Sequence, residues 1–273
     1  MSRTLTVLLL FFLCCGFPAW LQAASTDFGA AEQTVPQGLA GQTKTSPSAL
    51  QPSFLKRHAI PIGVCAGLLA GIGAFDKQIH ENIPELLTDR FGRRLDLHSV
   101  GKHNSILDDL GNPVGFFGIS GGFYLGGLIG RSENTRKVGI LAAEAGLVGS
   151  ALTGGIKFLV GRERPTNGKD ADTFKPLSGH DSFPSGHTST VFSVATVIST
   201  HYDSIWVSGI SYGLAGMVGL GRMFQNHHWA SDVTAGAMLG YGSGKLVTHW
   251  ENRKHWSRRL YTDGRSIFFV QRF

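Results

Sequence analysis

The sequence predicts an all-α protein: a bundle of about six core helices followed by a basic C-terminal tail. Two observations favour this class. Apolar stretches of about 14 to 20 residues alternate with polar connections, and no period-two alternation competes within them. Small residues also recur at every fourth position along these stretches. The predicted helices are 59–75, 113–130, 138–157, 187–200, 205–221 and 232–248.

The composition is that of an apolar, glycine-rich chain. Of the 273 residues, 42% are hydrophobic and only 16% are charged, whereas soluble domains carry about 25% charged residues. The formal net charge of +6 suits anionic partners such as phosphate esters or acidic lipid headgroups. Nucleic acid is not among the expected partners.

The N-terminal segment has the pattern of an export signal. Arg3 precedes an apolar run over 5–17, and small residues follow near position 24. We therefore expect 1–24 to be a signal peptide or, alternatively, an uncleaved anchor, which places the protein in the cell envelope. Residues 25–57 are rich in Gln, Ser, Thr, Pro and Gly and are expected to form a flexible arm.

The helical domain is expected over 58–250, in a membrane. Glycines four residues apart, as at Gly236, Gly240 and Gly244, let helix backbones approach closely, which is typical of membrane helices. A tightly packed soluble bundle in the periplasm is the alternative, because several segments are shorter than the roughly 20 residues of a span and Glu144 interrupts the third.

The C-terminal tail, 251–273, is strongly basic. Asp263 and Gly264 predict the turn of a short hairpin between 259–262 and 266–270. The tail either contacts anionic lipid headgroups or is a solvated extension.

The first chemical motif pairs Lys157 with Arg164, which stands directly before Pro165. A lysine offers a compact positive charge, and an arginine offers a planar fork that holds two oxyanion oxygens. Alone the pair is a weak signal, because basic residues are common at helix ends.

The second motif runs from Pro184 through Ser185, Gly186 and His187 into an apolar helix. Ser185 is expected at the N-cap, and Gly186 leaves the backbone amides open to an anion. His187 then lies where it could protonate a leaving oxygen. A capped helix with an incidental histidine is the alternative.

The third motif contains Arg222, His228 and Asp232. His228 and Asp232 share a helix face, so the carboxylate is expected to accept the Nδ1 proton and to leave Nε2 as a nucleophile. A zinc site that includes the adjacent His227 is disfavoured, because neighbouring histidines project in different directions.

The ordered motifs Lys-x6-Arg-Pro, Pro-Ser-Gly-His and Arg-x5-His-x3-Asp, over 157–232, resemble the type-2 phosphatidic acid phosphatase / vanadium haloperoxidase superfamily. This superfamily includes membrane lipid phosphatases and bacterial non-specific acid phosphatases. The chain departs from the pattern at Gly221, where the family often has serine.

The resemblance implies a division of roles. His228 would attack phosphorus and form a phosphohistidine, Asp232 would orient it, and His187 would protonate the leaving group and then activate water. No metal or other cofactor is implied, and vanadate would bind as a phosphate mimic. The implied phosphate-binding residues are Lys157, Arg164, Ser185, Gly186 and Arg222.

The expected function is therefore metal-independent hydrolysis of a phosphate monoester, with a lipid phosphate or lipid pyrophosphate as substrate. The alternatives are a soluble periplasmic acid phosphatase, a vanadate-dependent haloperoxidase and a non-catalytic phosphate-ester binding module. The connection 76–112 carries no specific motif. We expect its polar residues, such as His98 and Asp109, to form a solvated loop.

Overall fold

The structure is a computed structural model that describes residues 52–86, 106–168, 170–262 and 267–271. Two compact units divide the chain, Met1–Phe75 and Asp76–Phe273. The expected signal segment 1–24 lies outside the described residues, as does the expected arm up to residue 51. The first unit contributes one described helix, α2 (Pro52–Ala74), which begins inside the expected arm and covers the first predicted helix, 59–75, up to its last residue but one.

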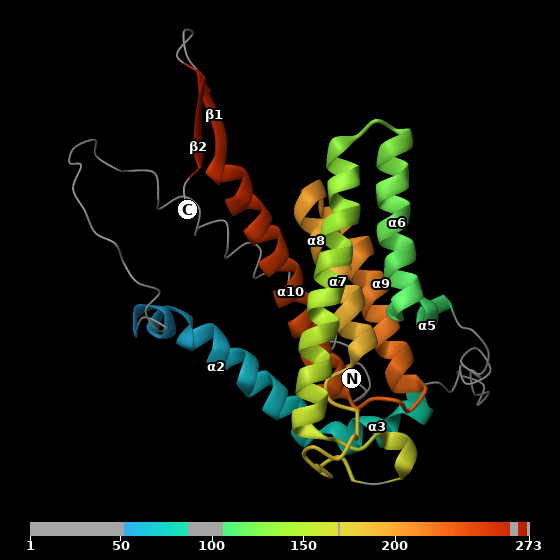
Figure 1. The fold of residues 1–273 in the computed structure, drawn as a ribbon. Coiled ribbons are helices and arrows are strands. Elements are labelled where there is room, and N and C mark those ends of the chain that lie inside the picture. The colour runs from blue at the N-terminus through green and yellow to red at the C-terminus, as the bar shows by residue number, and fades with distance from the viewer. Residues whose placement is uncertain (1–51, 87–105, 169, 263–266, 272–273) are drawn as a thin grey trace. The chain divides into compact units, whose positions relative to one another are not determined.

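The described residues of the second unit form helices joined by loops, followed by a C-terminal hairpin, which confirms the predicted class (Figure 1). Two short helices, α3 (Asp76–Leu86) and α5 (Ile106–Gly111), lie in the connection where no helix was predicted. The five long helices are α6 (Pro113–Ile129), α7 (Glu133–Val160), α8 (Gly186–Tyr202), α9 (Ile205–Phe224) and α10 (Ala230–Ser257).

Local capping explains why α7 begins earlier than its apolar pattern. The Ser132 side chain accepts a hydrogen bond from the Thr135 amide at 3.2 Å, and Glu133 places a negative charge in the first turn. The helix ends at Gly161, whose φ of 58° lies in the left-handed region that glycine adopts without strain. The chain then turns into the loop 161–185, which leads to α8.

The helix α8 lies at the centre and packs against α7, α9 and α10. Its contact with α10 uses the predicted glycine ridge: a Cβ at Gly240 would lie 2.2 Å from the Ser189 carbonyl oxygen, and one at Gly236 would lie 2.5 Å from that of Ser185. The similar ridge on α6 is not a helix contact, because a Cβ at Gly118 or Gly122 would meet nothing within 4 Å. The buried apolar core consists of Phe116, Val138, Leu141, Ala142, Ala145, Val194, Val197 and Val247.

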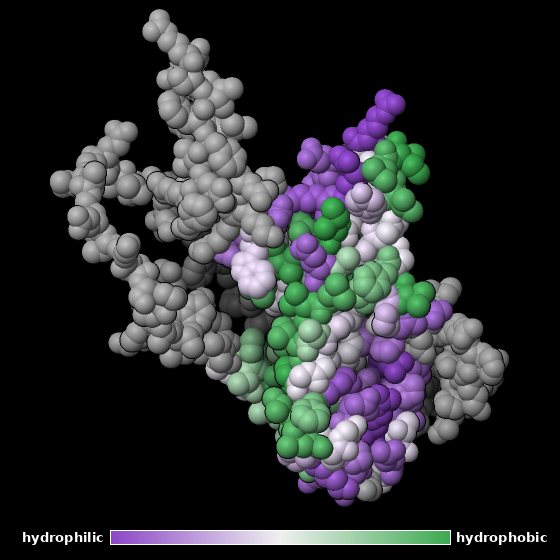
Figure 2. Space-filling model, viewed as in Figure 1, coloured by the Kyte–Doolittle hydropathy of each residue, from purple (hydrophilic) through white to green (hydrophobic). Residues whose placement is uncertain are grey.

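Large apolar side chains are exposed on the outer faces of the bundle. Within the described part of the chain, one helix, Glu133–Val160, is long and apolar enough to cross a membrane. Figure 2 shows apolar residues along α7 and polar residues gathered at the end where the loop 161–185 lies. The exposed apolar residues of α6, α7 and α9 include Val114, Leu125, Ile129, Ile140, Leu147, Phe158, Leu159, Trp206 and Ile210.

The C-terminal hairpin is confirmed. The strands β1 (Arg258–Thr262) and β2 (Ile267–Gln271) pair antiparallel, with Leu260 opposite Phe269. The helix α10 continues to Ser257, beyond its predicted end at 248, and leads directly into β1.

Candidate active site

The three motifs meet at one end of the bundle. Lys157 lies in the last turn of α7 and Arg222 in the last turn of α9, while Gly186 begins α8 and Asp232 lies in the first turn of α10. The Ser185 amide donates a hydrogen bond to the Asp232 carbonyl oxygen at 2.9 Å and so joins the starts of α8 and α10. Two basic side chains at the C-terminal ends of α7 and α9 therefore lie near the N-terminal ends of α8 and α10. This arrangement favours the binding of an anion.

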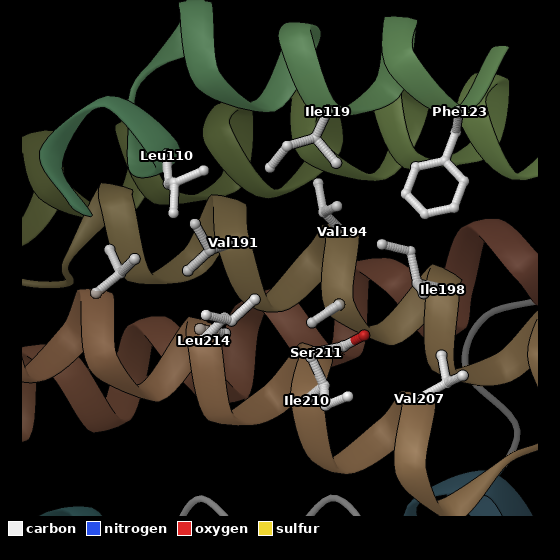
Figure 3. Close-up of a pocket in the computed structure, with 13 residues that line it drawn as sticks. Leu110, Ile119, Phe123, Val191, Val194, Ile198, Val207, Ile210, Ser211 and Leu214 are labelled. Carbon is white, nitrogen blue, oxygen red and sulfur yellow. The ribbon is translucent and has the colours of Figure 1, made fainter. Parts of the chain in front are cut away.

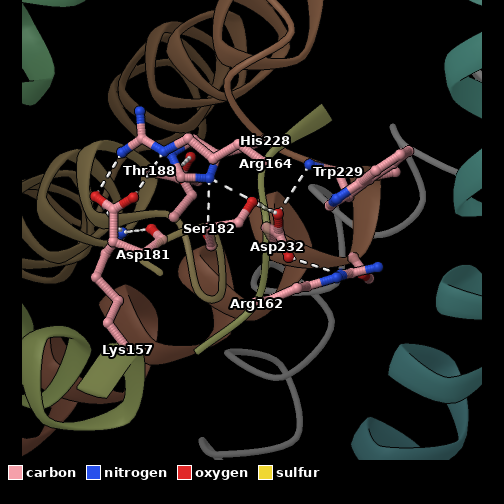
Figure 4. A network of polar contacts seen from close by, with 12 residues as sticks. Lys157, Arg162, Arg164, Asp181, Ser182, Thr188, His228, Trp229 and Asp232 are labelled. Atoms are coloured by element: carbon pink, nitrogen blue, oxygen red, sulfur yellow. Dashed lines mark hydrogen bonds and ion pairs between the residues drawn. The ribbon is translucent and has the colours of Figure 1, made fainter. Parts of the chain in front are cut away.

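Two of the predicted phosphate-binding cations contact Asp181, which the sequence analysis did not identify (Figure 4). Arg164 Nε and Nη2 donate to Asp181 Oδ1 and Oδ2 at 2.8 and 2.6 Å. Lys157 Nζ donates to the Asp181 carbonyl oxygen and lies 3.9 Å from Oδ2. Although burial raises the pKa of the Asp181 carboxyl, the Arg164 hydrogen bonds and the Lys157 charge hold that pKa below its usual value. The ionised carboxylate of Asp181 is therefore held by both Arg164 and Lys157.

The start of α8 supplies the buried wall of the site. Ser185 is fully buried at the N-cap position, but its side chain caps no backbone amide; its Oγ instead accepts a hydrogen bond from Thr188 Oγ1 at 2.9 Å. The lysine stem runs beside this helix start, since a Cβ at Gly186 would lie 3.8 Å from Lys157 Cε. His187, which follows Gly186 on α8, packs against the end of α5: a Cβ at Gly111 would lie 2.7 Å from His187 Cβ.

His228 lies in the turn before α10 and is only 3% exposed. Its Nδ1 lies 2.8 Å from the Ser182 carbonyl oxygen, whereas Asp232 Oδ2 is 3.7 Å away, within ion-pair range but beyond a hydrogen bond. The expected direct bond to Asp232 is therefore replaced by one to the backbone. A carbonyl oxygen only accepts, so Nδ1 carries the hydrogen and Nε2 keeps its lone pair.

Two opposing influences act on the His228 imidazole. Burial lowers its pKa, and the charges of Lys157 and Arg222 lower it further, while Asp232 raises it. The net direction is downward, so the neutral form, which can act as a nucleophile, is favoured.

Asp232 is a fully buried carboxylate in a dense set of donors. Its Oδ2 accepts from Ser182 Oγ at 2.6 Å and from the Trp229 amide at 2.9 Å. Its Oδ1 accepts from Arg162 Nη1 at 2.7 Å. These bonds fix the carboxylate beside His228 even though the two side chains do not hydrogen bond.

Arg222 completes the predicted set of cations. It is 7% exposed, and its Nη1 donates to Gln225 Oε1 at 3.1 Å. Its carbonyl oxygen accepts from the His227 amide at 3.0 Å, so the end of α9 is tied to the turn that carries His228.

Four polar residues of the site were missed by the sequence analysis: Asp76, Arg162, Asp181 and Ser182. Arg162 had a detectable signal, as a further basic residue between Lys157 and Arg164, and Ser182 stands just before the second motif. Asp76 had none, because it lies 155 residues from its partner Ser231.

The described residues contain no group of three or more His, Cys, Asp or Glu side chains that could hold a metal ion. The zinc alternative at His227, His228 and Asp232 therefore gains no support from the geometry.

Part of the chain is similar to a known protein family and to several known proteins. Residues 138–256 match the PAP2 superfamily. A lipid A 1-phosphatase from Porphyromonas gingivalis is 32% identical over 251 residues, which cover 88% of this chain and 49% of that protein. A lipid A 1-phosphatase from Rhizobium etli is 33% identical over 90 residues, 31% of this chain and 38% of that protein.

An undecaprenyl-diphosphatase from Sulfolobus acidocaldarius is 30% identical over 110 residues, 40% of this chain and 52% of that protein. The chain thus spans about half or less of the length of these curated relatives. Among solved structures, Aquifex aeolicus LpxE is similar with a TM-score of 0.47 and 23% identity, covering 63% of this chain and 93% of that one.

Proposed function

The chain belongs to the PAP2 superfamily through residues 138–256, and from this premise we propose that it is a metal-independent phosphatase that forms a phosphohistidine at His228. The observation that carries the proposal is the bond from His228 Nδ1 to the Ser182 carbonyl oxygen. This bond leaves the Nε2 lone pair available to attack, with the charges of Lys157 and Arg222 acting on the same imidazole.

In the first step, the Nε2 lone pair of His228 attacks phosphorus while the bond from phosphorus to the ester oxygen breaks. His187, as the imidazolium, donates its proton to the departing oxygen. In the second step, neutral His187 takes a proton from water, whose oxygen attacks the phosphohistidine and restores neutral His228. Lys157, Arg164 and Arg222 stabilise the charge on the transferring group in both steps.

We propose a lipid phosphate as the substrate. An apolar groove of about 410 Å³ lies between α6, α8 and α9 (Figure 3). Leu110 lines the groove, and the following residue, Gly111, packs against His187. A hydrocarbon chain in this groove would start beside the proposed general acid, and each buried CH₂ would contribute about 0.8 kcal/mol to binding.

Among lipid phosphates, the 1-phosphate of lipid A is favoured over an isoprenyl diphosphate. The lipid A 1-phosphatase of Porphyromonas gingivalis matches 88% of this chain, whereas the undecaprenyl-diphosphatase matches 40%. Both substrates place a phosphate next to long apolar chains, so the groove suits either.

We also propose that the protein resides in a membrane of the cell envelope. The exposed apolar side chains along α6, α7 and α9 form the kind of surface that membrane contact covers. Fractionation tests this: we expect the full chain in the membrane fraction, and recovery in the soluble periplasm would support the acid-phosphatase alternative.

Phosphoenzyme trapping tests the chemistry. The full chain is incubated with ³²P-labelled lipid phosphate and quenched in alkali, in which phosphohistidine persists. We expect label on the parent and on His227→Ala, but none on a folded His228→Ala, which should also release no phosphate. Labelled and active His228→Ala would contradict the proposal. Parallel assays on lipid A, phosphatidate, isoprenyl diphosphate and a soluble ester define the substrate.

A further inference from the structure

We propose that Asp76 is a positioning residue for this reaction, acting through Arg162 on Asp232 and thereby on His228. The inference rests on the proposed phosphatase function, but Asp76 itself lies outside all three motifs. Asp76 begins α3, is fully buried and holds two different parts of the site at once.

The first contact of Asp76 is with the start of α10. Its Oδ1 accepts from the Ser231 amide at 2.8 Å, and its Oδ2 accepts from Ser231 Oγ. Ser231 directly precedes Asp232, so Asp76 fixes the backbone that presents the Asp232 carboxylate.

The second contact is with Arg162, whose guanidinium bridges two carboxylates. Nη2 donates to Asp76 Oδ2 at 2.8 Å, and Nη1 donates to Asp232 Oδ1 at 2.7 Å and to Ser231 Oγ at 2.7 Å. Arg162 is 3% exposed, and its Cζ lies 5.6 Å from the Trp229 ring centroid. The planar fork of arginine is suited to this double contact.

The network continues from Asp232 to the nucleophile. Asp232 Oδ2 accepts from Ser182 Oγ, and the carbonyl oxygen of the same serine accepts from His228 Nδ1 (Figure 4). A shift of Asp232 would therefore move Ser182 and change both the direction and the tautomer of the imidazole.

The charges give Asp76 a second effect. Burial raises the pKa of Asp76, and the bonds from Ser231 and Arg162 oppose that shift. One guanidinium lies between two buried carboxylates, so with both carboxylates ionised the group carries one net negative charge beside His228. Phosphorylation of Nε2 leaves the imidazole ring cationic, and this negative charge stabilises it. Without Asp76, the Arg162 charge would offset Asp232 alone, and the ring would lose its counter-charge.

The neighbouring ion pair provides a matched control. Lys77 follows Asp76 on α3 and pairs with Asp170 of the loop 161–185 at 2.6 Å. This pair joins the same two segments, but both of its side chains are exposed, unlike Asp76 and Arg162. Exposed pairs contribute little, so Lys77→Gln isolates the general effect of altering α3.

The experiment measures kcat and KM on a lipid phosphate and Ki for inorganic phosphate, in the full chain. We expect Asp76→Asn to lower kcat about 100-fold, the scale of a slightly misplaced reacting group, with KM and Ki changed by less than about twofold. The retained Ki shows that the phosphate-binding cations are still assembled. Lys77→Gln should keep kcat within about twofold of the parent.

A second variant tests the route through Arg162. Arg162→Lys keeps the positive charge but lacks the planar guanidinium that donates to both Asp76 and Asp232. We therefore expect a loss of kcat similar to that of Asp76→Asn. Because both act through one network, the double variant should be no slower than the slower single variant.

The outcomes separate the inference from the proposed function. Parental kcat in Asp76→Asn, additive losses in the double variant, or a parallel loss of kcat and phosphate binding would each overturn the positioning role while leaving the phosphatase intact. A parent chain that releases no phosphate from any ester would overturn both.

Discussion

The Asp181 carboxylate accepts two hydrogen bonds from the Arg164 guanidinium, 2.8 Å from Nε to Oδ1 and 2.6 Å from Nη2 to Oδ2. This geometry is that of an arginine bound to two oxygens of a phosphate. The carboxylate of Asp181 would therefore compete with the phosphate that we propose Arg164 binds.

Replacement of Asp181 should strengthen anion binding. In Asp181→Asn the neutral amide is a weaker partner for Arg164 and Lys157, so we expect Ki for inorganic phosphate to fall about three- to tenfold, close to 1 kcal/mol. Asp170→Asn, in the same loop but paired with Lys77, is the control and should not change Ki. A higher Ki in Asp181→Asn would show instead that the carboxylate positions Arg164 for phosphate.

The tautomer and acidity of His228 can be measured without a substrate. Because burial lowers the pKa of His228, its neutral form should persist below the ordinary value of about 6.5. NMR titration of ¹⁵N-histidine-labelled protein, with His228→Ala to assign the resonance, should show a midpoint below pH 6.5 and a hydrogen on Nδ1 in the neutral form. A midpoint above pH 6.5, or a hydrogen on Nε2, would be incompatible with the nucleophile described here.

Filling the apolar groove should discriminate between substrates by chain length. Ala195 lines the groove on α8, and Ala195→Phe would occupy space that a hydrocarbon chain needs. We expect KM for a long-chain lipid phosphate to rise about tenfold, equivalent to about 1.4 kcal/mol, and KM for a short soluble ester to stay within about twofold. An equal rise for both esters would mean that the substitution disturbs the site itself.

The proposed metal-independent mechanism can be tested with chelators. In the proposed mechanism, Lys157, Arg164 and Arg222 stabilise the charge on the transferring group without a metal ion, so EDTA should leave phosphate release unchanged. Vanadate should inhibit competitively by occupying the same cations. Inhibition by EDTA that added zinc reverses would favour the metal alternative.

The helices were predictable because their signals are local. Apolar runs located α6 to α10, and the Asp263-Gly264 turn signal located the hairpin. The predicted helix boundaries were wrong where capping or tertiary contacts determine them. The Ser132 cap starts α7 before its apolar pattern begins, and α3 was missed because it carries little apolar pattern of its own. Gly118, Gly122 and Gly126 of α6 show the same limit: their spacing resembles that on α10, but a Cβ at any of them would meet nothing within 4 Å.

By itself, the sequence determined the helical class and the three motifs, because residue spacing and side-chain chemistry are properties of the chain. The sequence could not determine which other residues form hydrogen bonds with the residues of the motifs. Only the tertiary structure brought Asp76 to Ser231 across 155 residues, put the Ser182 carbonyl rather than Asp232 on His228 Nδ1, and set Asp181 against Arg164. Hydrogen-bond partners within a buried cluster are selected by distances of a few tenths of an ångström, and packing alone sets those distances.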